Sequence, residues 1–211
     1  MDALPMFPLG AVLLPGELLP LQVFEPRYLE MVAQLTSSPE PPRFGVVLIT
    51  RGHEVGGGDE RTDVGTVARI VDCEQVPGGR LLLGCVGESR IRVRRWLPDD
   101  PYPRAEVDPW PDEGGDHRTE AVDEVGALVD ELGGLLSRSA ALRGIPVPGF
   151  PRLDELPGEL GERIYALAAT LPLVAVDRLR LLSAPGPGER LTVLTEALED
   201  VIAAVRFRLS E

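Results

Sequence analysis

The 211-residue sequence has 44% hydrophobic and 26% charged residues, a composition typical of a soluble globular protein of one or two domains. The formal net charge is −13, and both halves contribute to it: residues 1–117 carry 19 acidic side chains and 11 arginines, and residues 118–211 carry 15 and 10. This charge repels phosphate and therefore argues against a general nucleic-acid binder.

The opening run, "LPMFPLGAVLLPGELLPLQVF" from Leu4 to Phe24, carries a single charge, Glu17. Prolines and glycines interrupt it, and a proline inside a helix removes a hydrogen bond and clashes with the preceding turn. A secretion signal requires a positively charged stretch before its apolar region, and no such stretch precedes this run. We therefore expect short buried strands separated by turns, neither a signal nor a membrane span, and a cytoplasmic location.

A helix pattern begins at Pro26, because proline suits the first helical turn. Apolar residues then recur at three- and four-residue spacing, at Tyr28, Met31, Val32 and Leu35. The next run, "RFGVVLIT", predicts a buried strand, and "RGHEVGGGDERTD" predicts a polar loop.

Two strand patterns, "VGTVARIVDCEQV" and "RLLLGCVGESRIRVRRW", surround "PGG", which predicts a hairpin. In the second pattern Ile91 and Val93 alternate with arginines, so one face is expected to be buried and the other wet. Cys73 and Cys85 are the only cysteines and fall within these patterns. We expect both to be unbonded and buried in a reduced core.

The segment "RAEV" predicts a last strand, and the prolines and acids of residues 109–118 indicate a boundary. From Thr119 onward the apolar period changes to that of helices. Four helices are expected: one beginning at Thr119, one over 160–171, a short one at "VAVDRLRLLS", and a long last one over 191–205. Strands followed by helices favour an α+β fold, with a β subdomain at 1–117 and a helical subdomain at 118–211.

The sequence contains no lysine, so it lacks the lysine of a Walker A loop and that of a Ser–Lys catalytic dyad. His53 and His117 fall in a polar loop and in the acidic boundary, without a nucleophile in a recognisable motif. The two cysteines and two histidines do not have the spacing of a metal site. We therefore expect no catalytic residue, no metal and no cofactor; a hydrolase with an unrecognised site is the least favoured hypothesis.

The one basic feature is "RIRVRRW", which holds Arg90, Arg92, Arg94, Arg95 and Trp96. Arginines on one strand face beside an aromatic ring can hold a nucleic-acid backbone and stack a base. The favoured interpretation is structural: the arginines pair with neighbouring acids, and the tryptophan covers the core.

Several motifs occur in an order that resembles the N-terminal substrate-binding domain of ATP-dependent Lon proteases. They are "FPLGAVLLPGELLPLQVFEPRY", "EVGGG", "DVGTVARI", "GRLLLGCVGESRIRV" and "PYPRAEV". The resemblance covers nearly the whole chain. It implies a PUA-like β pseudobarrel followed by a helical bundle, and a role in recognising unfolded or tagged proteins. Lon's ATPase and peptidase lie downstream of this domain, and the resemblance does not extend to them.

The first functional hypothesis is therefore a non-catalytic module that binds unfolded or apolar-rich polypeptides, or an adaptor for a separate protease or chaperone. The alternative is an RNA-binding PUA-like module; neither nucleic acid nor a membrane is the expected partner. Exposed apolar residues beside a sheet can bind extended peptide, so the candidate contacts are Leu14, Leu18, Arg27 and Tyr28. The competing interpretation places the leucines, Phe24 and Tyr28 in the core and pairs Arg27 with a nearby acid.

Overall fold

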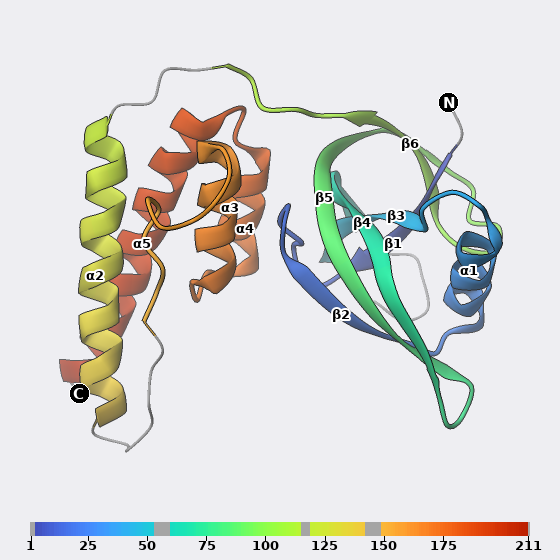
Figure 1. The fold of residues 1–211 in the computed structure, drawn as a ribbon, viewed down its shortest axis with the longest axis horizontal. Coiled ribbons are helices and arrows are strands. Elements are labelled where there is room, and N and C mark those ends of the chain that lie inside the picture. Colours follow the sequence, from blue (N-terminus) through green and yellow to red (C-terminus); the bar gives the residue numbers. More distant parts are fainter. Residues whose placement is uncertain (1–2, 53–59, 115–118, 142–148, 211) are drawn as a thin grey trace. The chain divides into compact units, whose positions relative to one another are not determined.

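The computed structural model describes residues 3–52, 60–114, 119–141 and 149–210, and the chain divides into two compact units, residues 1–111 and 112–211. The first unit is mainly strands and the second is helical (Figure 1). This is the α+β arrangement that the sequence predicts. The division falls inside the proline- and acid-rich stretch 109–118. The subdomain limit between 117 and 118 stays a prediction, because residues 115–118 lie outside the described ranges.

The first unit contains, among its described residues, six strands and one helix: β1 Leu4–Leu9, β2 Leu18–Val23, α1 Pro26–Ser37, β3 Arg43–Arg51, β4 Glu60–Val76, β5 Arg80–Leu97 and β6 Arg104–Pro109. Their order in the sheet is β2-β5-β4-β3-β1-β6, and β6 also pairs with β5. Five strands therefore close into a barrel, and β2 extends the sheet from β5. All neighbours are antiparallel except β1 and β3, which run parallel.

Apolar side chains from both ends of the unit's sequence fill the barrel. The largest cluster contains the rings of Phe7, Tyr28 and Phe44, and the ring of Tyr28 stacks on that of Phe7 with centroids 4.0 Å apart. Tyr28 belongs to α1, whose predicted apolar stripe is confirmed by the burial of Tyr28, Met31 and Val32. Burying such side chains contributes about 1.5–3 kcal/mol each, which fixes α1 against the barrel.

The predicted hairpin is formed by β4 and β5, and its turn uses Gly78 and Gly79 in left-handed conformations, with φ of 88° and 71°. The end of β4 is exposed, since this hairpin extends beyond the core (Figure 1). Cys85 is buried as expected, but Cys73 is exposed, so the prediction that both thiols are buried is wrong for Cys73. Both thiols are free. The strand pattern identified the element but not how far the core reaches along it.

The connection from β1 to β2 is held against β5 at Gly87. Gly16, in a left-handed conformation with φ of 81°, donates its N–H to the carbonyl of Gly87, and Gly87 donates to the carbonyl of Glu17. A Cβ at Gly87 would lie 2.4 Å from the carbonyl oxygen of Leu14, closer than real contacts allow. The glycine therefore lets the connection approach β5 and sets where β2 begins.

The second unit contains, among its described residues, four helices: α2 Thr119–Ala141, α3 Leu160–Thr170, α4 Ala175–Ser183 and α5 Pro187–Ser210. Their positions confirm the helices expected from the sequence. Arg190 of α5 is fully buried, and it donates to both carboxylate oxygens of Asp112, at 2.9 and 2.6 Å. Its guanidinium also lies 3.9 Å from the ring centroid of Tyr165. The pair fastens the first residue of this unit to its helices, and a buried charge requires such a partner.

In the part of the chain that the structure describes, every helix is too short or too polar to cross a lipid bilayer.

Candidate functional site

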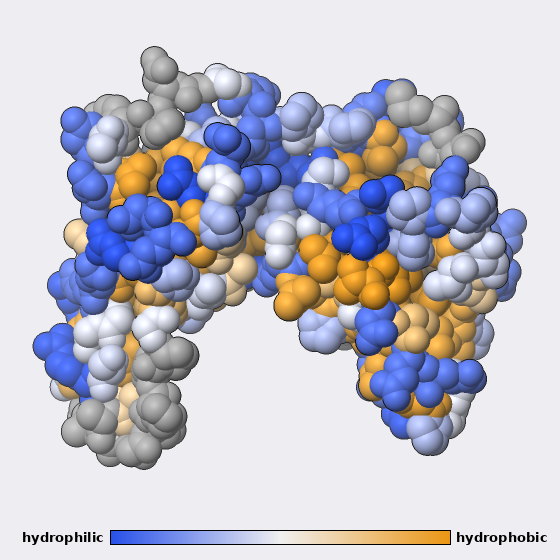
Figure 2. All heavy atoms as spheres, viewed as in Figure 1, coloured by the Kyte–Doolittle hydropathy of each residue, from blue (hydrophilic) through white to orange (hydrophobic). Residues whose placement is uncertain are grey.

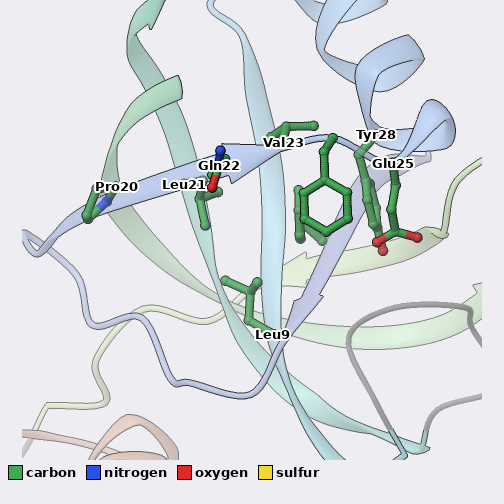
Figure 3. A pocket seen from close by; sticks show the side chains of 9 residues that line it. Leu9, Pro20, Leu21, Gln22, Val23, Glu25 and Tyr28 are labelled. Carbon is green, nitrogen blue, oxygen red and sulfur yellow. The ribbon is translucent and has the colours of Figure 1, made fainter. Parts of the chain in front are cut away.

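A pocket of about 180 Å³ lies beside β2 in the first unit (Figure 3). Residues of β1, β2 and the start of α1 form its walls. Six of them are apolar or aromatic: Phe7, Leu9, Leu21, Val23, Phe24 and Tyr28. The remaining walls come from Pro20, Gln22 and Glu25. A concave, mostly apolar site with a few polar groups is typical of a binding site.

Glu25 is the charged side chain of the pocket wall, and it lies beside Tyr28 at the end of β2 (Figure 3). Its carboxylate accepts a hydrogen bond from the guanidinium of Arg27, at 3.1 Å. The same guanidinium lies 4.6 Å from the ring centroid of Tyr28. Arg27 is therefore engaged with an acid, as one of the two interpretations of the sequence expected.

The four candidate contacts from the sequence lie in different environments. Leu18 is 73% exposed at the start of β2, whereas Leu14 is 0% and Tyr28 is 2% exposed. The side chain of Arg27 is 18% exposed. Leu14 is thus a core residue and offers no surface to a partner, which corrects its choice as a contact. Tyr28 is also buried, but its side chain forms part of the pocket wall.

Phe24 is a residue that the sequence interpretation placed in the core, but it is 52% exposed and lines the pocket. It lies between the end of β2 at Val23 and the start of α1 at Pro26. Strand alternation was the signal that would have found it, because Val23 faces the core and its neighbour must face away.

The outer face of the β2–β5–β4 sheet continues this apolar surface. Leu18 pairs with Val86 across the strands, and Leu82 and Val71 are 41% and 48% exposed. Figure 2 shows hydrophobic side chains gathered over the region of β2. Exposed apolar groups grouped on one face indicate an interaction surface, whereas single ones do not.

The arginine side chains of the β5 stretch contact other residues of the same unit. Arg90, expected on the wet face, is 4% exposed, and its guanidinium lies 4.4 Å from the ring centroid of Trp110. The reason is distant in sequence: the end of β6 pairs with this part of β5, and the N–H of Trp110 donates to the carbonyl of Arg90. Arg92 lies over the same ring at 3.5 Å. Trp110 thus covers two of the four arginines.

The other two arginines pair with acids of β6. The guanidinium of Arg94 donates to Asp108 at 3.0 Å, and that of Arg95 donates to Glu106. The hydrogen bond and the charge of Arg95 lower the pKa of Glu106. Trp96 packs against a core cluster, as the structural interpretation of this stretch predicted.

Metal-ligating and nucleophilic side chains were two further candidates for chemistry. No group of three or more His, Cys, Asp or Glu side chains among them lies close enough to hold a metal ion. Burial, with a smaller contribution from Cys73, raises the pKa of the Cys85 thiol to about 12, so this sulfur stays protonated and is a poor nucleophile. His53 and His117 lie outside the described residues.

Comparison with known proteins identifies the family. The family model of the ATP-dependent protease La (LON) substrate-binding domain matches residues 3–200. The chain belongs to the Lon substrate-binding domain family. The matched residues are those of the substrate-binding domain alone.

Known Lon proteins are similar to this chain in sequence and in fold. A Lon protease of Roseiflexus castenholzii is 30% identical in an alignment over 209 residues, with coverage of 94% of this chain and 24% of that protein. The chain thus spans about a quarter of the length of this relative. A Lon N-terminal domain protein from Xanthomonas campestris is 31% identical, with a TM-score of 0.66 and coverage of 93% of this chain and 98% of that one.

A further Lon domain shares the fold at lower identity. The N-terminal domain of the Mycobacterium avium complex Lon protease is 18% identical, with a TM-score of 0.63 and coverage of 94% and 99%. Both structural relatives are nearly fully covered, so the barrel and the helices together form the common fold.

Proposed function

We infer that this Lon-type domain binds unfolded or apolar-rich polypeptides without catalysis, and that the contact lies on β2. The observation that carries this proposal is the apolar surface along β2, which includes an exposed side chain at each end of the strand and a pocket. Leu18 and Phe24 are exposed at its two ends, and the pocket lies between them. The family description, a substrate-binding domain of a protease, agrees with a polypeptide ligand.

The proposed role is that of an adaptor, which holds a polypeptide for a separate protease or chaperone. Unfolding or cutting the bound polypeptide requires ATPase and peptidase groups. These 211 residues contain no lysine for either a Walker A loop or a Ser–Lys dyad. A purified preparation is therefore expected to hydrolyse neither ATP nor casein; turnover that persists through further purification would contradict this.

Titration with unfolded casein at low and at physiological salt tests the binding. Apolar contact survives moderate salt, because screening weakens charge pairs and not burial. Leu18→Asp is expected to weaken binding by about tenfold or more, since burying a leucine contributes about 1.5–3 kcal/mol. Val176→Asp is the matched control, because Val176 is 59% exposed on α4 in the other unit.

A second pair of variants examines the other end of β2. Phe24→Ser is expected to weaken casein binding, and Phe207→Ser, at a phenylalanine 65% exposed on α5, is expected to leave it unchanged. Salt-resistant binding that ignores both Leu18→Asp and Phe24→Ser would keep the function and reject the site. Binding that disappears with salt would favour an electrostatic ligand such as RNA.

A further inference from the structure

β2 has one unpaired edge. It stands at the end of the sheet order and pairs with β5, and among the described residues no strand pairs with its other side. Pairing starts at Glu17, whose carbonyl accepts from the N–H of Gly87. Backbone groups of successive strand residues point to opposite sides, so Leu18, Pro20 and Gln22 direct theirs to the open edge.

Proline occupies a position consistent with this alternation. Pro20 has no N–H and so sits where no hydrogen bond to β5 is required. The open edge then offers the N–H groups of Leu18 and Gln22, and the carbonyl oxygens of Leu18, Pro20 and Gln22. These are the groups that an added strand pairs with.

The pocket lies along this edge, because Pro20, Leu21, Gln22 and Val23 all line it. β2 has six residues and therefore a length of about 20 Å. An extended segment of similar length would direct alternate side chains into the pocket. The others would lie over the outer face, beside the exposed Leu18.

Charges of both signs lie on the outer face of the sheet, and those of β4 are separated from β2 by β5. Glu74 is exposed and lies in one row with Leu82 and Gln22, Asp72 lies in the row of Gly84 and Pro20, and Arg69 lies in the row of Val86 and Leu18. The Cβ that an alanine would place at Gly84 lies 3.3 Å from the Cβ of Asp72, so Asp72 is on this outer face. Glu25 stands at the end of the strand, with Arg27 as its partner. Acidic and basic side chains are thus both present, and the apolar walls of the pocket favour an apolar segment.

We propose that the open edge of β2 takes an extended, apolar segment of an unfolded polypeptide as an additional strand. This inference rests on the proposed function and adds the mode of binding and the class of segment. Main-chain hydrogen bonds supply affinity for any extended chain, while the apolar pocket supplies the selection.

The backbone part is tested on the protein with Gln22→Pro and its control Gln22→Val. The proline removes one outward N–H at an edge position where proline is tolerated, and the valine keeps that N–H. Binding of casein is expected to fall by about fivefold in Gln22→Pro and to be retained in Gln22→Val, which corresponds to one hydrogen bond. Thermal unfolding of both variants establishes that the fold is intact.

Main-chain pairing is also tested with N-methylated peptides and the wild-type protein, because this leaves the folding of the protein unchanged. A peptide with an apolar centre and lysines at both ends is methylated on alternate backbone nitrogens, in either of two registers. Methylation in one register removes the peptide N–H groups that face β2, and it is expected to abolish binding. Methylation in the other register leaves these N–H groups in place, and binding is expected to be retained. Equal binding of both registers, together with an unaffected Gln22→Pro, overturns strand addition while casein binding keeps the proposed function.

The selection part is tested by exchanging the apolar residues at the centre of the peptide for serines, with the terminal lysines unchanged. The serine peptide is expected to bind about tenfold more weakly at low and at high salt, because the lost contact is apolar. Equal affinities overturn the selection for apolar segments. Absence of casein binding by the wild type overturns the proposed function and this inference together. Self-association that Gln22→Pro abolishes, without any peptide binding, would assign the edge to a second copy of the chain.

Discussion

β2 and the arginine-rich end of β5 belong to the same unit, but they differ in what their exposed groups contact. The arginines of β5 are bound to Trp110 and to acids of β6, so their charge is already used within the barrel. Leu18 and Phe24 of the β2 region are exposed beside an open edge and a pocket. The arginine stretch, which in the sequence looks more like a binding motif, is thus occupied by contacts within its own unit, whereas the apolar run at the start of the sequence leaves Leu18 and Phe24 exposed.

The largest effect that would break this comparison is expected at Gly87, which holds the start of β2 against β5. Gly87→Ala places a Cβ 2.4 Å from the carbonyl oxygen of Leu14, so the connection must move. We expect the free energy of unfolding to fall by about 3 kcal/mol. Urea unfolding followed by tryptophan fluorescence measures it, because both tryptophans, Trp96 and Trp110, lie in this unit.

Gly84→Ala is the matched control for that measurement. Its added Cβ would face the outer surface, with Asp72 at 3.3 Å as the nearest neighbour, and we expect a cost below about 1 kcal/mol. Equal losses in the two variants would show that the approach at Gly87 does not position β2.

The two thiols report on whether β2 stays attached to β5. Cys85 pairs with Leu19 of β2, is buried, and has its pKa raised to about 12 by burial, whereas Cys73 is exposed. A thiol reagent is expected to label Cys73 rapidly and Cys85 at least about 100-fold more slowly, because labelling of Cys85 requires local opening. The variant Cys73→Ser isolates the slow thiol. Rapid labelling of Cys85 in native protein would mean that β2 detaches readily.

The pH dependence of stability tests whether the ion pairs of the barrel, such as that of Glu88, stabilise the fold. Hydrogen bonds from Arg43 and Arg69, together with their charges, lower the pKa of Glu88 below its ordinary value. A carboxylate whose pKa is lower in the folded state than in the unfolded state stabilises the fold at pH values above its unfolded-state pKa. This stabilisation is lost as the pH falls through the folded-state pKa. Glu88→Gln is therefore expected to lower stability at pH 7 by about 1 kcal/mol or less and to reduce the acid dependence.

Urea unfolding of this variant between neutral and acid pH checks the expectation. Glu74→Gln, at an exposed carboxylate of the same sheet, is the control and is expected to change little. An unchanged acid dependence in Glu88→Gln would show that the two arginines do not stabilise Glu88 in solution.

The smallest effect is expected at the exposed ion pairs of β5 and β6. Arg94→Ala is expected to lower the free energy of unfolding by about 0.5 kcal/mol or less, because Arg94 and Asp108 are both well exposed and their attraction is screened.

The wild type is expected to show little or no binding of structured RNA at physiological salt in a mobility-shift assay. Tight RNA binding that Arg94→Ala weakens would reverse the comparison and give the alternative RNA-binding function to this strand.

Periodicity alone predicted most of the elements, since helix and strand patterns are properties of neighbouring residues. The stripe of α1, the strand β6 and the four helices of the second unit all lie where the sequence indicates. The order of the motifs was also sufficient to identify the family, because it depends on the sequence and not on contacts. Strands followed by helices likewise predicted the α+β class.

Tertiary structure decided which residues of these elements meet solvent. Leu14 and Leu18 belong to one apolar run, but the first is enclosed where the connection lies on Gly87, and the second begins a strand with an open edge. Arg90 is buried because Trp110, twenty residues later in the chain, covers it. Local pattern determines which face of a strand is apolar; burial depends on which distant segments pack on that face, and those contacts arise only when the barrel closes.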